Sequence, residues 1–295
     1  MTLIIGFKCV DGIALVSDTK IIDTESGNIS YDSKILTPLE DTPCMVGLAG
    51  YMNLFEEFNR KIPYIVKQRI SEIRISNVEE LIKTGLSRKE SIEYVTSREK
   101  CLSSILKKIE NDSKNECIVN PNIAEIELPY QYSEENFIDD CKSLIKQISS
   151  QNENIEDSLE ILIGIRRPRD KKLHMHQIFS DSSEIESDEY LVIGSGYQYA
   201  ETVFGQVYDY NKKMSVLITE AFRTILYAVM VGKESLVGYT HENPPEAVVI
   251  HNDGTYGKVL FENESVVVNE IEQEMENIVQ QIKNSHISTL KFKQC

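Results

Sequence analysis

The sequence predicts an α+β protein in which strands and helices are grouped into separate runs. Residues 1–50 form short apolar, strand-like segments separated by turn residues. Over most of residues 51–150, the apolar residues recur at helical spacing. Strand-like segments return after residue 158, followed by helix, strand and helix. Grouped strands favour stacked α and β layers over alternating βαβ units.

Length and charge narrow the class of protein. The chain has 295 residues, 41% of them hydrophobic, and we expect one domain over 1–295. The formal net charge of −16 disfavours nucleic acid or anionic membrane as a partner. The sequence lacks the ~18-residue apolar run of a membrane span and a secretory signal pattern. We therefore expect a cytoplasmic protein.

Cysteines and histidines give no sign of a metal site. The six cysteines form no CxxC pair and have no histidine at ligand spacing, so they read as free thiols in a reducing compartment. His174 and His176 share one face of a predicted strand. A half-exposed strand explains them better than a metal pair, because no third ligand is evident.

The first half of the chain is read as strands followed by helices. The expected strands are TLIIGFKCV, IALVSDTKI, ISYDSKILTP and CMVGLAG, the first two joined at the turn Asp11-Gly12. A helix should begin at about residue 51 and be kinked or interrupted by Pro63. Residues 62–130 are expected to form a helical insertion, with a capping box from Ser87 to Glu90. Another helix should follow Ser133.

The second half returns to strands. The expected segments, in order, are the strands SLEILIGIRR and LHMHQIFS, the strand–turn–helix EYLVIGSGYQYAETVFGQV, the helix SVLITEAFRTILYAVMVG and the strand AVVIHNDG. Residues 262–295 should add a short strand and a long acidic helix.

Thr2 follows Met1 directly, and this position gives it potential chemistry. If Met1 is removed, Thr2 carries both a hydroxyl and a free α-amine. A hydroxyl is a poor nucleophile without a base, and an α-amine with a pKa of ~8 can take up a proton and return it. Nucleophile and base would then share one residue.

Such a nucleophile needs a cation, a carboxylate and an oxyanion donor nearby. Lys34 lies in an apolar segment, Asp18 lies near the end of the second strand, and Gly47 in VGLAG allows close backbone approach. A three-residue loop, Val10 to Gly12, would pair Asp18 with Ile4 and bring it within reach of Thr2. Each of these residues also has an ordinary role in a strand or turn.

These residues resemble the start of proteasome β-type subunits, which are N-terminal-nucleophile hydrolases. The matching positions are Thr2, Gly6, Asp11-Gly12, Asp18 and Lys34, with Gly47 after a one-residue deletion, and Ser195 in the GSGYQYA segment. The placement of Thr2 directly after Met1 resembles the bacterial two-component, ATPase-driven peptidase and the bacterial ancestral β-like proteins more than it resembles the usual proteasome β subunit. The family's second-shell Asp and Ser are not matched; Glu234 and Ser235 are the nearest substitutes.

The resemblance implies a four-layer αββα sandwich and a threonine peptidase that needs no cofactor or metal. It implies that Thr2 attacks a peptide bond and that Lys34, oriented by Asp18, lowers the pKa of the Thr2 hydroxyl and amine. It also implies that the Gly47 N–H binds the oxyanion and that Ser195 forms a hydrogen bond close to the terminal amine. Implied partners are a peptide or unfolded-protein substrate, further copies in a ring or spiral, and potentially an ATPase or other proteasome-type subunits. Another amidohydrolase, a peptide ligase and a non-catalytic subunit stay open as alternatives.

Overall fold

The computed structural model contains two compact units. One, the sheet unit, comprises Met1–Arg60 and Lys142–Cys295; the other, the helical unit, comprises Lys61–Cys141. The structure describes residues 2–22, 28–39, 43–50, 52–96, 133–150, 159–167, 170–231, 237–240 and 242–259, with Gln273 and Asn277. Apart from Gln273 and Asn277, the predicted extension over 262–295 lies outside the described residues, as do Glu234 and Ser235, the nearest substitutes for the second-shell pair.

The sheet unit contains two five-stranded antiparallel sheets. The first has the order β10-β1-β2-β11-β12, with bounds Tyr190–Ile193, Ile4–Cys9, Gly12–Ser17, Glu246–His251 and Tyr256–Lys258. The second has the order β5-β6-β7-β8-β9, with bounds Ile35–Leu36, Cys44–Ala49, Glu160–Arg166, Leu173–Ile178 and Glu184–Glu186. A separate hairpin pairs β3 (Lys20–Ile22) with β4 (Ile29–Tyr31).

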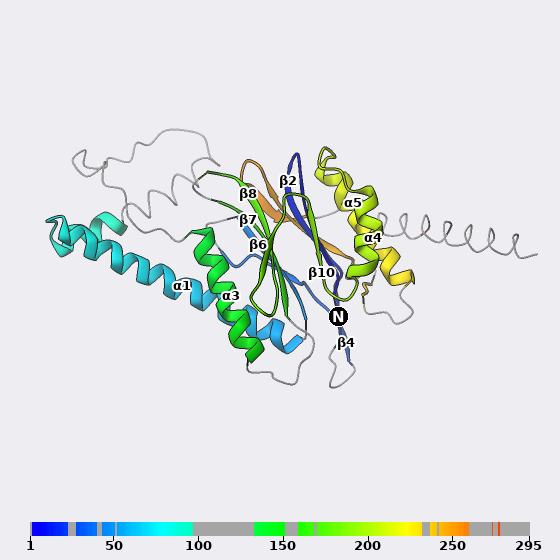
Figure 1. The fold of residues 1–295 in the computed structure, drawn as a ribbon, viewed down its shortest axis with the longest axis horizontal. Coiled ribbons are helices and arrows are strands. Elements are labelled where there is room, and N and C mark those ends of the chain that lie inside the picture. The colour runs from blue at the N-terminus through cyan, green and yellow to red at the C-terminus, as the bar shows by residue number, and fades with distance from the viewer. Residues whose placement is uncertain are drawn as a thin grey trace, which may run out of the picture. The chain divides into compact units, whose positions relative to one another are not determined.

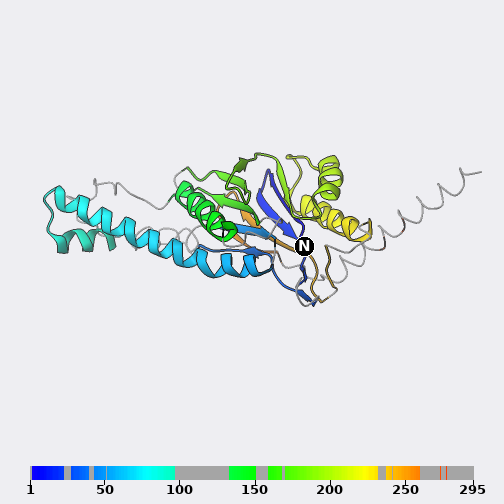
Figure 2. The same ribbon diagram turned by 60° about the horizontal axis from the view of Figure 1, so that its bottom comes forward.

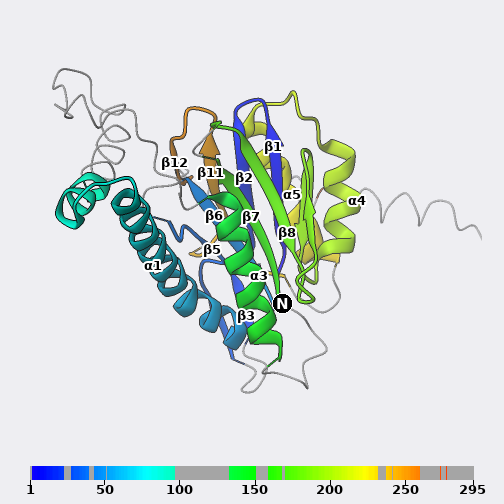
Figure 3. The same ribbon diagram turned by 60° about the vertical axis from the view of Figure 1, so that its left-hand side comes forward.

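Helices cover the outer faces of the sheets. Helices α4 (Tyr197–Val207) and α5 (Met214–Val231) lie side by side against the first sheet (Figures 1 and 2). The second sheet is covered by the start of α1 (Met52–Lys83) and by α3 (Glu134–Ser150) from Lys142 onward (Figure 3). Buried side chains on these two helix segments include Leu54, Phe58, Ile145 and Ile148. The predicted αββα sandwich is confirmed.

Alternation along β1 explains why this strand is apolar on both faces. Leu3, Ile5 and Phe7 pack in the core beneath α4 and α5, whereas Ile4 packs in the core between the sheets. Every residue of β1 and β2 is buried. A strand in an inner layer has no solvent face, so its sequence shows no polar alternation.

The helical unit confirms one capping prediction and corrects another expectation. Residues 88–96 are helical, and Ser87 and Glu90 exchange the two hydrogen bonds of a capping box, at 2.9 and 3.3 Å. Leu81, Tyr94 and Val95 form its small buried core. The expected interruption at Pro63 is wrong: α1 runs as one helix from Met52 to Lys83. Helices tolerate an interior proline at a penalty of about 3 kcal/mol where other contacts hold them.

None of the helices within the described segments is both long and apolar enough to cross a membrane.

The packing of α4 on the first sheet gives a stability prediction. Phe204 is fully buried and contacts the rings of Phe7, Tyr190 and Tyr208. Phe204→Ala should lower the free energy of unfolding by about 3–5 kcal/mol because it leaves a cavity. On the same helix Tyr199 is 40% exposed, and Tyr199→Ala should change the free energy by less than about 1 kcal/mol. Chemical denaturation of both variants would test this, and equal losses would contradict the packing.

Candidate active site

The β1–β2 hairpin sets the position of Asp18, but not by the predicted loop. Cys9 pairs with Gly12 and Ile4 with Ser17, so the loop has two residues, Val10 and Asp11. The predicted three-residue loop is therefore wrong. At Gly12 φ is 154°, and a Cβ would lie 2.1 Å from the Ile250 carbonyl oxygen. This glycine permits close approach of β11, a constraint that the hairpin sequence does not reveal.

Asp18 follows the last residue of β2, and its carboxylate is fully buried. Its Oδ1 accepts a hydrogen bond from the Leu3 backbone N–H at 2.8 Å and one from Lys34 Nζ at 2.8 Å. Its Oδ2 accepts one from the Gly238 N–H at 3.0 Å. Burial raises the pKa of Asp18, and the Lys34 ammonium and both N–H donors oppose that rise. The carboxylate thus ties Lys34 to the residue after Thr2.

Lys34 lies between β4 and β5, with only 2% of its surface exposed. Burial lowers the pKa of its amine, while the charges of Asp18 and Glu246 act in the opposite direction and that of Lys20 adds to the lowering. A buried ammonium requires such negative partners. The predicted pairing of Lys34 with Asp18 is present, at 2.8 Å.

A glycine-rich turn between β10 and α4 encloses Thr2, which is 5% exposed. At Gly194 φ is 95°, and a Cβ there would lie 2.1 Å from the Thr2 carbonyl oxygen, so only glycine fits. The Thr2 backbone N–H donates to Ser195 Oγ at 3.3 Å. Glu160 Oε2 accepts the Gly194 N–H at 3.2 Å and steadies this turn from β7. Ser195 therefore lies beside Thr2, as the sequence pattern predicts.

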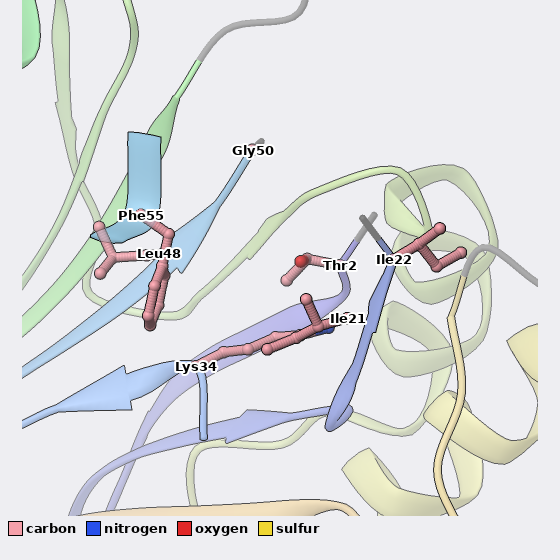
Figure 4. Close-up of a pocket in the computed structure, with 7 residues that line it drawn as sticks. All are labelled: Thr2, Ile21, Ile22, Lys34, Leu48, Gly50 and Phe55. Atoms are coloured by element: carbon pink, nitrogen blue, oxygen red, sulfur yellow. The ribbon is translucent and has the colours of Figure 1, made fainter. Parts of the chain in front are cut away.

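Thr2 and Lys34 open onto a common pocket (Figure 4). Most of its other lining is apolar, and the whole set is Thr2, Ile21, Ile22, Lys34, Leu48, Gly50 and Phe55. The residues come from five places: the chain start, β3, the segment between β4 and β5, the end of β6 and the start of α1. An apolar recess beside a hydroxyl and a buried amine can hold an apolar side chain next to a reacting group.

Gly47, the predicted oxyanion glycine, is not among the residues that line this pocket. It lies within β6 between Ile35 and Leu162, and a Cβ there would meet Ile4 at 3.0 Å, inside the core between the sheets. Gly50, just beyond β6, does line the pocket and has φ of 146°. Both glycines belong to the segment VGLAG, so spacing alone does not separate them.

The histidine pair on β8 is bonded to glutamates of β9. His174 Nδ1 lies 2.7 Å from Glu186 Oε1, and His176 Nδ1 lies 2.7 Å from Glu184 Oε1. Glu184 also pairs with Lys142. These contacts give both histidines a role in the pairing of β8 with β9.

Comparison with known proteins supports the fold at low identity. No protein-family model matches the sequence, and no curated protein matches it. Solved structures do match over nearly the whole chain. The Anbu (ancestral beta-subunit) protein from Yersinia bercovieri has 12% identity and a TM-score of 0.58, covering 99% of this chain and 100% of its own.

Two further solved structures agree. An Anbu (Gly-1) mutant from Hyphomicrobium sp. strain MC1 has 10% identity and a TM-score of 0.57, covering 100% of both chains. Anbu from Pseudomonas aeruginosa, solved as a helical assembly, has 11% identity and a TM-score of 0.55, covering 95% of this chain and 96% of that one. Likeness at this identity establishes the fold, which is proteasome-like.

The recognition of the chain as a proteasome β-type subunit is corrected by these matches. The similar structures are named Anbu proteins, a specific group, at 10–12% identity. The reason for the error is chemical. The motif of Thr2, Asp18 and Lys34 describes the arrangement around a terminal threonine, and such an arrangement does not separate one group of proteins from another within a fold.

The buried ion pair gives a pH-dependent prediction. Lys34→Met should lower the free energy of unfolding by about 3–5 kcal/mol at pH 7, because Asp18 is left as an unpaired buried charge. Without Lys34, burial holds the pKa of Asp18 above its unfolded value. Stability is then fully present below the unfolded pKa and is lost as pH rises through the folded pKa.

The difference in unfolding free energy between wild type and Lys34→Met should therefore shrink as pH is lowered from 7 to about 5. Urea denaturation across this range measures it. The double variant Lys34→Met, Asp18→Leu is the matched control and should show little of this pH dependence. A constant difference for the single variant would show that Asp18 is not the charge left unpaired.

Proposed function

We propose that the protein is a threonine-type N-terminal-nucleophile peptidase, active after removal of Met1. One observation carries this proposal: Asp18 Oδ1 accepts hydrogen bonds from both Lys34 Nζ and the Leu3 backbone N–H. Leu3 directly follows the buried Thr2. A buried lysine–aspartate pair adds little net stability compared with apolar residues of similar size. A chemical role gives a reason for it.

In the proposed reaction Thr2 Oγ attacks the carbonyl carbon of a peptide bond. The hydroxyl proton passes to the Thr2 α-amine, the carbon–nitrogen bond breaks, and the ammonium returns the proton to the leaving amine. The products are an ester on Thr2 and a released peptide. Water then attacks the ester carbonyl and gives a proton to the amine. The bond between the acyl carbon and Thr2 Oγ breaks, the ammonium returns the proton to Oγ, and the acyl peptide leaves with a new carboxyl group. The Lys34 ammonium favours the deprotonated forms of the hydroxyl and amine.

We assign the oxyanion-binding N–H to Gly50 in place of Gly47, since Gly50 lines the pocket. Ser195 Oγ, at 3.3 Å from the Thr2 nitrogen, would accept a hydrogen bond from the amine once Met1 is removed. The lining by Ile21, Leu48 and Phe55 favours substrates with an apolar side chain on the acyl side of the bond. A peptide series that varies only this side chain tests that preference.

The mechanism predicts a specific loss on mutation of Thr2. The intact mass of the purified protein should equal that of the chain without Met1. The protein should also cleave peptides in a mixture of fluorescence-quenched substrates. Thr2→Ala should lower kcat/KM by at least about 10⁴-fold, as loss of a nucleophile does in comparable enzymes. Thr2→Ser, which keeps a hydroxyl and a small second residue, is the matched control and should keep measurable activity. Equal activity of Thr2→Ala and wild type would refute the proposal, as would retention of Met1 in an active protein.

We further propose that the protein self-associates. The support is the Pseudomonas aeruginosa structure, whose title describes a helical assembly. Light scattering coupled to size exclusion should give a mass several times 33.7 kDa. Thr2→Ala, which leaves every surface unchanged, should elute at the same mass as the wild type. A monomer at all accessible concentrations would contradict self-association without affecting the proposed chemistry.

A further inference from the structure

Glu246 is a buried carboxylate that the proposed mechanism has not yet used. It is the first residue of β11, is 3% exposed, and pairs in register with Ser17 of β2. Carboxylates are seldom buried in this way unless they are paired and hydrogen-bonded. Its partners therefore indicate what it does.

Three donors converge on one oxygen of Glu246. Oε1 accepts the Lys34 backbone N–H at 2.9 Å, the Ser33 hydroxyl at 2.7 Å and the Ser17 hydroxyl at 3.3 Å. Ser17 directly precedes Asp18. The Glu246 side chain thus holds both Ser17, at the end of β2, and the backbone of Lys34, in the segment between β4 and β5.

The second oxygen of Glu246 is itself buried and pairs with a surface lysine. Glu246 Oε2 lies 3.1 Å from Nζ of Lys258, whose side chain is 55% exposed. Negative and positive groups therefore alternate from the interior to the surface, in the order Asp18, Lys34, Glu246 and Lys258. An exposed partner is screened by water, so Lys258 compensates the buried charge only in part.

We propose that Glu246 is a positioning residue for Lys34: it holds the Lys34 backbone against β2, and its carboxylate places a second buried negative charge at the Lys34 segment. The charges that act on Lys34 besides that of Glu246 are those of Asp18, at the end of β2, and Lys20, of β3. In the proposed active form the Thr2 α-amine would join them, since Thr2 and Lys34 line the same pocket. Asp18 alone faces both Lys34 and the chain start, and Glu246 supports the pair from the opposite strand.

The charge of Glu246 has a measurable consequence. It raises the pKa of Lys34 against the lowering by burial. Glu246→Gln keeps the side-chain shape and an oxygen to accept the same hydrogen bonds, and it removes only the charge. The pKa of Lys34 should then fall, because a nearby opposite charge favours the charged form of the amine. A merely structural role would not move this pKa.

The experiment is an NMR titration of the full chain with lysines labelled at ¹³Cε, in wild type, Glu246→Gln and Lys258→Met. The Lys34 signal is the one absent from Lys34→Met. The inference requires a lower Lys34 pKa in Glu246→Gln. It also requires no lowering in Lys258→Met, which removes a positive charge on the far side of the same carboxylate. An unchanged Lys34 pKa in Glu246→Gln would overturn it.

The positioning part of the inference rests on the proposed function and is read separately. The rate of Thr2 acylation by a β-lactone should fall in Glu246→Gln and hold in Lys258→Met. No acylation of wild type would count against the proposed function, and the titration would still decide the charge effect. If Glu246→Gln does not fold, Glu246→Asp replaces it. Glu246→Asp keeps the charge on a shorter side chain, so its Lys34 pKa should stay near the wild-type value while Thr2 is acylated more slowly. An acylation rate equal to that of the wild type would overturn the positioning role.

Discussion

The buried ion pair between Lys34 and Asp18 is the constraint on which the site depends. Both side chains are almost fully buried, so the protein itself must supply most of the groups that stabilise their charges. Asp18 meets this need with two backbone N–H donors as well as the ammonium. One donor belongs to Leu3, so solvation of the carboxylate also fixes the residue next to Thr2. Electrostatic satisfaction and placement of the chain start are achieved by one set of hydrogen bonds.

In the same unit, two positions must be glycine because the backbone of another segment comes too close for a side chain. Gly12 admits the Ile250 carbonyl, and Gly194 admits the carbonyl of Thr2 itself. The first contact joins β2 to β11, and the second joins the residues before β1 to the turn before α4. Strands β1 and β2 are buried along their whole length, so such approaches cannot relax toward solvent. Thr2 is therefore buried just before β1, with its carbonyl against Gly194 and its N–H donating to Ser195 Oγ.

Sequence reasoning recovered the layers and several neighbours of Thr2, and the reasons are physical. Apolar runs mark buried strands, and a charged residue within such a run, like Lys34 or Asp18, demands a partner. The hairpin loop was mispredicted because Gly12 is required by a strand more than 230 residues away. Gly50 was missed because VGLAG offers two glycines and the pocket selects one. Glu246 gave only a weak signal, an acid at the start of an apolar strand, and its partners are visible only in three dimensions. The catalytic roles themselves stay predictions.

The most direct test of the central claim is tandem mass spectrometry of the protein after reaction with a β-lactone or epoxyketone probe. A hydroxyl activated by its own α-amine should be the acylated group. We expect a single adduct on a peptide whose first residue is Thr2, with the modification on that residue. An adduct confined to another residue, or to a peptide that still begins with Met1, would contradict it.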